Sequence, residues 1–168
     1  MDQQTFQATV FIYKDKMFRF AKRMLVDEED AFDRVQDVML KLWQKREELY
    51  QYKNLEAFAM RCIKNECINK LRHDEVEKAY TTARILPTTT ETDPGNMRDI
   101  ILDILNNLPE KQKMVVHLKD VEEFSIPEIA DTLEMEENAV RVNLMRGRQK
   151  IKSQLEKIFE YEKQQFSK

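Results

Sequence analysis

Glycine is nearly absent from this sequence, which has only Gly95 and Gly147 among 168 residues. Hairpin turns and β-bulges commonly need glycine, because glycine adopts positive φ angles without steric cost. A hairpin-rich β protein is therefore not expected. The same scarcity excludes the G-x-G-x-x-G and Walker A loops that hold nucleotide phosphates, and with them a nucleotide-driven enzyme.

Cysteine and histidine are also rare, with two residues of each type. Cys62 and Cys67 lie five positions apart in a helical pattern, and we interpret them as reduced thiols in or beside the core of a cytosolic protein. His73 and His117 do not fall in a Cys/His metal-binding spacing, so we expect no metal site. Because no nucleophile–base pair can be assembled either, we expect no cofactor and no enzymatic activity.

Long apolar runs are missing too. No stretch approaches the roughly 18 apolar residues that a membrane-spanning helix needs. The first ten residues, MDQQTFQATV, lack the basic segment and apolar run of a signal peptide. We therefore expect a cytoplasmic protein that does not insert into a membrane.

Apolar residues recur at helical spacing through most of the chain, which predicts an all-α fold. Residues 81–96 break this pattern with six threonines, two prolines and a glycine, a composition typical of a flexible linker. We predict two small helical domains, 1–80 and 97–168, joined by the linker 81–96. Helices are expected over residues 6–25, 28–43, 55–79, 97–107, 109–118, 126–133 and 138–161.

A helix-turn-helix motif is expected in the second domain. Ser125 and Glu128 have the spacing of a capping box, which would begin the short helix 126–133. A tight polar turn follows, and then the long helix 138–161. This short helix, turn and second helix have the lengths of a DNA-binding helix-turn-helix.

Charge is strongly segregated along the chain, although the formal net charge is only −3. Residues 120–137 contain eight acids and no lysine or arginine, whereas residues 141–157 contain six bases and one acid. A basic second helix could enter the major groove of DNA while its bases neutralise phosphates. A basic solvated helix face is the alternative interpretation, but the position of the run in the motif favours DNA contact.

A weaker segregation of charge occurs in the first domain. Residues 27–37 hold six acids and one base, and residues 53–72 hold five bases and two acids. Tyr50 and Tyr52 lie in the intervening loop. Aromatic rings beside bases suit single-stranded nucleic acid, because unstacked nucleobases can lie on the rings. Packing of the two tyrosines over a helix end remains an alternative.

Two sequence strings resemble a known family. The string DAFDRVQDVMLKLW, from Asp30 to Trp43, and the run FAMRCIKNECINKLR, from Phe58 to Arg72, are similar to the σ2 domain of bacterial extracytoplasmic-function (ECF) sigma factors. Residues 108–155 resemble the σ4 domain of the same family. The resemblance covers nearly the whole chain in the family's order. It implies a σ2-like helical bundle and a σ4-like helix-turn-helix, in a non-catalytic specificity subunit of RNA polymerase.

The resemblance also implies roles for individual positions. Core RNA polymerase would bind at Asp33, Gln36, Asp37, Leu40 and Trp43. The melted −10 promoter element would bind at Tyr50, Gln51, Tyr52, Lys53, Asn54, Arg61, Asn65 and Asn69. The duplex −35 element would bind at Asn138, Arg141, Asn143, Met145, Arg146 and Arg148. An anti-sigma factor that wraps around both domains is a further partner implied by the family.

Several residues depart from the family's pattern. Glu136 replaces the usual small hydroxyl cap, Asn143 stands where a second basic residue is common, and Phe58 stands where tryptophan is common. Glu134 stands where the motif turn usually contains glycine. Gly147 interrupts the last helix, where a glycine costs about 1 kcal/mol relative to alanine.

Two other functions remain open on the residues alone. A two-domain helix-turn-helix regulator would bind duplex DNA tightly without polymerase. A helical adaptor would bind a protein and no nucleic acid, so that reversing the charge of Arg141 and Arg146 would leave its activity intact. A sigma factor, in contrast, would open a promoter only together with core polymerase.

Overall fold

The computed structural model describes residues 1–80 and 97–165, which form helices with no strand among them. The all-α prediction is therefore confirmed. The elements are α1 (Gln3–Thr9), η1 (Phe11–Tyr13), α2 (Lys14–Met24), α3 (Glu28–Gln44), η2 (Leu49–Gln51), α4 (Leu55–Tyr80), α5 (Met97–Asn106), α6 (Glu110–Val116), η3 (His117–Val121), α7 (Ile126–Leu133) and α8 (Glu137–Gln165). The predicted flexible linker, 81–96, lies outside the described residues. No helix of the described part is long and apolar enough to cross a membrane.

Residues 1–80, the N-terminal module, are built around α2, α3 and α4. Asp27 begins α3, because its carboxylate accepts a hydrogen bond from the backbone N–H of Asp30 at 2.9 Å. The acidic first turn of α3 is also favourable beside the positive end of the helix dipole. Asn54 begins α4 in the same way, accepting from the backbone N–H of Ala57 at 2.9 Å. The residues buried between these helices include Met17, Phe20, Ala21, Val35, Val38, Met60 and Ile63.

The first predicted helix, residues 6–25, is divided in the structure. α1 ends at Thr9, one 3-10 turn follows, and α2 begins at Lys14. The break lets Phe6 pack edge-on against Trp43 with ring centroids 5.1 Å apart, while Val10 at the break is fully buried. Apolar spacing did not predict the break, because both segments turn their apolar sides to the same core.

Residues 97–165, the C-terminal module, contain the predicted helix-turn-helix as α7 and α8. The capping box is confirmed: the backbone N–H of Ser125 donates to the Glu128 carboxylate at 2.8 Å, and that of Glu128 donates to Ser125 Oγ at 3.3 Å. The prediction for Pro109 was wrong by one residue, since its extended ψ of 144° makes it the N-cap of α6. α8 begins one residue earlier and ends four residues later than predicted.

Two of the residues that depart from the family's pattern, Glu134 and Gly147, have a clear structural consequence. Glu134 ends α7 in the left-handed region, with φ 55° and ψ 48°, which glycine adopts without strain. Gly147 lies where α8 passes α6, and a Cβ atom there would stand 2.7 Å from Cγ2 of Val116. The glycine that weakens α8 therefore permits the close approach of two helices.

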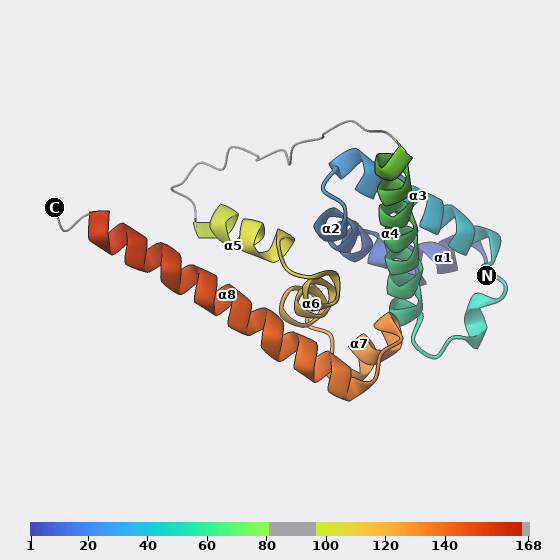
Figure 1. Cartoon of the computed structure of the whole chain (residues 1–168). Helices are drawn as coiled ribbons and strands as arrows, with labels where there is room; N and C mark the ends of the chain where they lie inside the picture. The colour runs from blue at the N-terminus through green and yellow to red at the C-terminus, as the bar shows by residue number, and fades with distance from the viewer. Residues whose placement is uncertain (81–96, 166–168) are drawn as a thin grey trace.

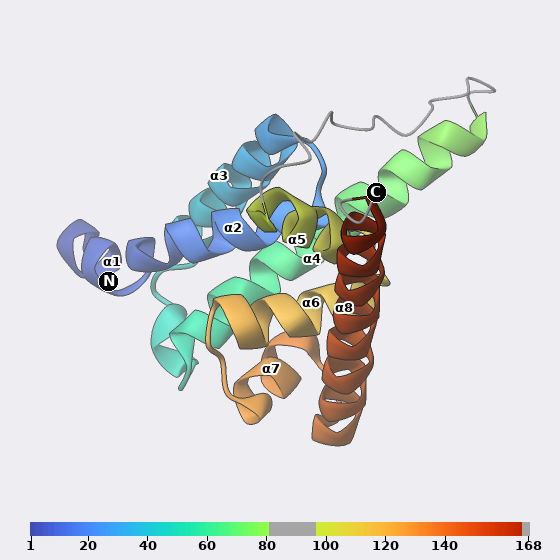
Figure 2. The same cartoon turned by 90° about the vertical axis from the view of Figure 1, so that its left-hand side faces the viewer.

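The two modules pack against each other. In both views α6 lies beside α2, and α7 lies at the N-terminal half of α4 (Figures 1 and 2). Buried residues of the two modules form one contiguous apolar cluster, in which Phe20 of α2 meets His117 of η3 with ring centroids 5.7 Å apart. The C-terminal end of α8 projects away from the N-terminal module (Figure 1).

Candidate functional site

The outer face of α3 carries the residues predicted to bind core polymerase. Asp33, Gln36 and Leu40 are exposed, and Leu40 keeps 56% of its surface accessible. Asp37 is half-buried and pairs with Arg34 one turn earlier at 3.1 Å. Trp43 differs from the others, because it is partly buried against Phe6 rather than displayed on this face. Four of the five residues are therefore brought to one accessible surface, and the fifth packs α1 onto α3.

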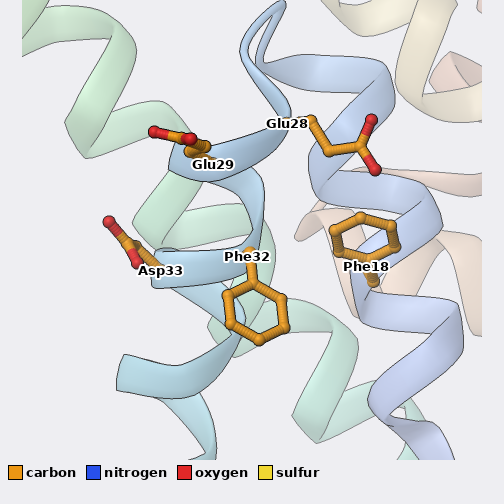
Figure 3. Close-up of a pocket in the computed structure, with 5 residues that line it drawn as sticks. All are labelled: Phe18, Glu28, Glu29, Phe32 and Asp33. Carbon is orange, nitrogen blue, oxygen red and sulfur yellow. The ribbon is translucent and has the colours of Figure 1, made fainter.

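A hollow of about 420 Å³ opens beside this face. Figure 3 shows the rings of Phe18 and Phe32 side by side between α2 and α3, with Glu28 on the same side and Glu29 and Asp33 pointing away. Apolar spacing did not predict this apolar and acidic hollow, because Phe18 falls among the apolar positions of the helix predicted over residues 6–25. The sequence feature that could have indicated the hollow is Phe32, an aromatic residue on an otherwise acidic side of the helix. In the structure Phe32 is 45% exposed.

The loop between α3 and α4 displays one of its two tyrosines. Leu49 is buried and anchors η2, which leaves Tyr50 with 67% of its surface exposed. Tyr52 instead stacks on Phe58 of α4, with ring centroids 3.6 Å apart and an angle of 17° between the planes. Tyr50 is thus available as a stacking surface, whereas Tyr52 packs over the start of a helix. Gln51 and Lys53 are exposed beside them.

The middle of α4 presents amides and a small cavity. Asn65 and Asn69 are exposed one turn apart on the same face, where each amide can both donate and accept hydrogen bonds. Asn65 also lines a cavity of about 220 Å³ between α3 and α4, together with Lys41, Lys45 and Phe58. Sequence reasoning missed the two lysines, of which Lys41 lies in the last turn of α3 and Lys45 caps its end. Glu66 also lines the cavity, and its carboxylate accepts a hydrogen bond from Nζ of Lys41 at 2.5 Å. A cavity with an aromatic wall and an amide can hold a planar polar ring, and of its two ammonium groups that of Lys41 is paired with Glu66 and that of Lys45 is not.

Cys62 lines this cavity, and Cys67 is fully buried in the core. Burial raises the pKa of Cys67 to about 12, and burial also raises the pKa of Cys62. Both thiols are therefore protonated at neutral pH, and neither is activated as a nucleophile.

Arg61 contacts the C-terminal module, unlike Tyr50, Asn65 and Asn69, which are exposed. Its Nη2 donates to the backbone carbonyl of Asp131 at 2.8 Å and to the Asp131 carboxylate at 2.5 Å. One turn along α4, Nζ of Lys64 donates to the Glu134 carboxylate at 2.8 Å. Asn54 is also occupied, because it caps α4. The basic side of α4 thus faces the acidic segment of the C-terminal module.

A second contact joins α2 to η3. Arg19 donates two hydrogen bonds to the carboxylate of Glu122, each 2.7 Å long, and Nε2 of His117 lies 3.4 Å from the same carboxylate. Glu122 retains only 6% of its surface. Burial alone would raise the pKa of Glu122, but His117 and Arg19 together lower it to about 2. The carboxylate is therefore charged and held in place.

The exposed side of α8 carries most of the predicted −35 residues. Asn138, Arg141, Met145 and Arg148 recur at helical spacing on one exposed face, and Arg146 is exposed at its edge. Arg141 pairs with Glu137 at 2.9 Å, and Arg148 pairs with Asp120 of η3 through two hydrogen bonds.

Asn143 lies away from that face. It is half-buried, and its amide donates to the backbone carbonyl of Ala139 at 2.8 Å. The structure therefore leaves five of the six predicted residues accessible from outside.

Comparison with known proteins follows the division into two modules. Residues 12–75 match the family model for Sigma-70 region 2, and residues 98–151 match that for Sigma-70, region 4. The ECF RNA polymerase sigma factor SigW of Bacillus subtilis is 25% identical over 92% of this chain and 90% of its own length. The RNA polymerase sigma-E factor of Streptomyces avermitilis is 27% identical over 90% of this chain and 85% of its own.

Two solved structures have a similar fold over most of this chain. The sigma factor RpoE from Bartonella quintana, in complex with the anti-sigma factor NepR, superposes with a TM-score of 0.76 at 20% identity and covers 91% of this chain and 98% of its own. CnrH, in complex with the cytosolic domain of CnrY, gives a TM-score of 0.69 at 20% identity, covering 92% and 90%. These likenesses extend over both modules.

Proposed function

The chain belongs to the sigma-70 family as an ECF-type sigma factor, and we propose that three of its surfaces divide the work of transcription initiation. A sigma factor of this type binds core RNA polymerase and directs it to −10 and −35 promoter elements. We assign polymerase and −10 binding to residues 1–80 and −35 binding to residues 97–168, with 81–96 as the connection.

The outer face of α3 is the proposed site for core polymerase. Asp33 and Asp37 supply negative charge there, and Leu40 supplies exposed apolar surface. This combination fits a partner helix that presents basic and aliphatic side chains, because opposite charges steer association while buried apolar area holds the complex. Trp43 contributes indirectly, by fixing α1 against the end of α3.

The loop and the exposed face of α4 are the proposed site for the melted −10 strand. Tyr50 offers a stacking surface, while Asn65 and Asn69 offer amides to the edges of unpaired nucleobases. Lys53 lies between them in the chain and can neutralise a phosphate. Arg61 belongs to the same helix but reaches DNA only when its contact with Asp131 is broken.

The exposed face of α8 is the proposed reader of the duplex −35 element. Arg141 and Arg146 lie near the start of α8, the part of a recognition helix that enters the major groove. An arginine bound to guanine by two hydrogen bonds contributes about 1–3 kcal/mol of discrimination. Asn138, Met145 and Arg148 extend the same surface.

The remaining roles are also proposals. We infer that the protein works in the cytoplasm without chemistry of its own, since sigma factors select promoters and the polymerase makes RNA. An anti-sigma factor is the proposed inhibitory partner, because the similar sigma factor RpoE was solved in complex with the anti-sigma factor NepR. The family match does not favour a regulator that acts apart from polymerase.

The observation that carries the proposal is the exposed basic face of α8 in a chain that also matches Sigma-70 region 2 over residues 12–75. The test is run-off transcription from a promoter library, with core polymerase alone and with the protein added. We expect specific transcripts only when the protein is present. Absence of any specific start site would contradict the assignment.

Variants of α8 make the test residue-specific. Arg141→Glu with Arg146→Glu should lower the specific transcript by at least about tenfold, because two groove contacts become repulsive. Lys152→Glu with Lys157→Glu changes the net charge by the same amount on a more distal part of the helix and should have a smaller effect. Equal losses in the two variants would indicate a non-specific charge effect.

A further inference from the structure

Two basic side chains between the modules have no acidic partner. Arg23 of α2 and Lys113 of α6 are both half-buried, and α6 lies beside α2 (Figures 1 and 2). The other cations that join the modules, Arg19, Arg61 and Lys64, each bind a carboxylate. Within the described part of the chain, neither Arg23 nor Lys113 forms an ion pair.

The charges of Arg23 and Lys113 affect each other. Burial lowers the pKa of Lys113, and the positive charge of Arg23 lowers it further, whereas Glu110 one turn earlier acts in the opposite direction. Burial also lowers the pKa of the Arg23 guanidinium, and no acidic group among the described residues opposes this effect. Two like charges that have partly lost their hydration raise the free energy of the folded protein unless an anion lies beside them.

Hydrogen-bond donors from three helices meet around Arg23. Its Nη1 donates to Oδ1 of Asn106, the last residue of α5, at 2.8 Å. Because the amide oxygen faces the guanidinium, the amide nitrogen of Asn106 remains available as a donor. Nε of Arg23 is buried and has no hydrogen-bond partner among the described residues. With the ammonium of Lys113, these are the groups that bind phosphate oxygens in proteins.

We propose that Arg23, Lys113 and Asn106 form a binding site for a small anion that carries phosphate groups. Arg23 supplies a planar fork of donors, Lys113 a compact positive charge and Asn106 a neutral donor. The oxygens of a phosphate accept hydrogen bonds from all three, and its negative charge offsets the repulsion between the two cations. The ligand joins α2 of one module to α5 and α6 of the other.

The position of the two cations favours a small anion over a nucleic acid. Both are half-buried between helices, whereas a DNA backbone needs a row of exposed bases such as that on α8. The inference is independent of the proposed promoter-binding and polymerase-binding surfaces, because none of them contains these residues.

Binding is tested on the full-length protein by isothermal titration calorimetry in a phosphate-free buffer at constant ionic strength. The three probes are inorganic phosphate, pyrophosphate and ATP, and we expect saturable binding of one ligand per chain. Equal affinities for phosphate and ATP would identify a single phosphate group as the ligand. Tighter binding of pyrophosphate and ATP would identify a chain of phosphates. Absence of saturable binding for all three probes overturns the proposal.

Variants assign the binding to these residues. Arg23→Gln with Lys113→Gln should weaken it by at least about tenfold, because charge-assisted hydrogen bonds are lost. The matched control, Lys152→Gln with Lys157→Gln, removes the same charge from exposed positions of α8 and should change the affinity by less than about twofold. Equal losses in the two variants would indicate general attraction of anions to basic side chains, and the site would be rejected. Arg23→Lys keeps the charge but loses the fork, so it too should bind more weakly, and it serves as the test if the double variant does not fold.

Thermal unfolding gives a second readout. A ligand that binds only the folded protein raises the midpoint by about 2–4 °C when its free concentration is about five times the dissociation constant. The Arg23→Gln, Lys113→Gln variant should lack this rise. Phosphate that competes for Arg19, Arg61 and Lys64 affects both proteins alike, so the difference between them measures the site. An equal rise of the midpoint in both proteins contradicts the proposal.

Discussion

At the scale of single residues, the turn of the helix-turn-helix carries strain that a different residue would relieve. Glu134 has φ 55° and ψ 48°, a conformation that costs a residue with a Cβ about 1–2 kcal/mol. Its compensation is the ion pair with the buried Lys64. We expect Glu134→Gly to be more stable to unfolding than Glu134→Ala by about 1 kcal/mol, because both lose the pair and only glycine loses the strain.

Chemical denaturation of the two variants measures this difference. Asp131 supplies the control, since it also binds α4 but lies inside α7. There the order should reverse, with alanine more stable than glycine by about 1 kcal/mol, as helix propensity requires. If Glu134→Ala is as stable to unfolding as Glu134→Gly, then the left-handed conformation at position 134 carries no strain.

At the scale of elements, the distance between α6 and α8 is set by a missing side chain. A Cβ atom on Gly147 would lie 2.7 Å from Cγ2 of Val116, which is itself buried. Gly147→Ala gains about 1 kcal/mol of helix propensity but forces the helices apart, and overpacking of this kind costs about 1–3 kcal/mol. We expect a net loss of stability of up to about 2 kcal/mol.

A double-mutant cycle isolates the contact. In a Val116→Ala background the obstructing methyl groups are gone, so Gly147→Ala should become neutral or stabilising by up to about 1 kcal/mol. Thermal or denaturant unfolding of the four proteins gives the coupling free energy. A coupling energy near zero would mean that Gly147 is present for some reason other than helix contact.

Most elements followed from the sequence, because their signals are local. Apolar spacing predicts the helices, Ser125 and Glu128 predict the start of α7, and the acidic run beginning at Asp27 predicts the start of α3. The break after Thr9 and the reason for Gly147 could not be predicted in this way. Both depend on which distant residue, Trp43 or Val116, packs against the segment.

In the candidate site, too, features of a single helix could be predicted from the sequence, whereas contacts between distant segments could not. Exposed residues on one helix, such as Asp33 and Asn65, could be placed from spacing, and the resemblance supplied their roles. The partners of Arg61 and Lys64 could not, since they come from about 70 residues further along the chain. The sequence does contain a basic segment in one domain, residues 53–72, and an acidic segment in the other, residues 120–137. Only the packing of the modules shows that the two face each other.

At the scale of the whole molecule, the net charge of −3 conceals this pairing. The acids of residues 120–137 include those that hold the C-terminal module against α2 and α4, while the bases of α8 remain on the outside. The same acidic segment therefore lowers the net charge of the chain and holds the two modules together. The contact between the modules is therefore sensitive to anions that compete for Arg19, Arg61 and Lys64.

The contact between Arg19 and Glu122 makes stability depend on acid pH. Arg19 of α2 and His117 of η3 face the Glu122 carboxylate, whose pKa is lowered from 4.5 to about 2 in the folded protein. The Glu122 carboxyl group takes up a proton more readily in the unfolded chain than in the folded protein. The charged carboxylate therefore stabilises the folded state fully above about pH 4.5, and this stabilisation is lost as the pH falls toward 2. Glu122→Gln cannot take up the proton, so the difference between its free energy of unfolding and that of the wild type should shrink through this window. Denaturant unfolding of both proteins between pH 6 and pH 3 measures the difference, in which the contributions of other carboxylates cancel. Parallel pH profiles would contradict a charged Glu122 at the contact between the modules.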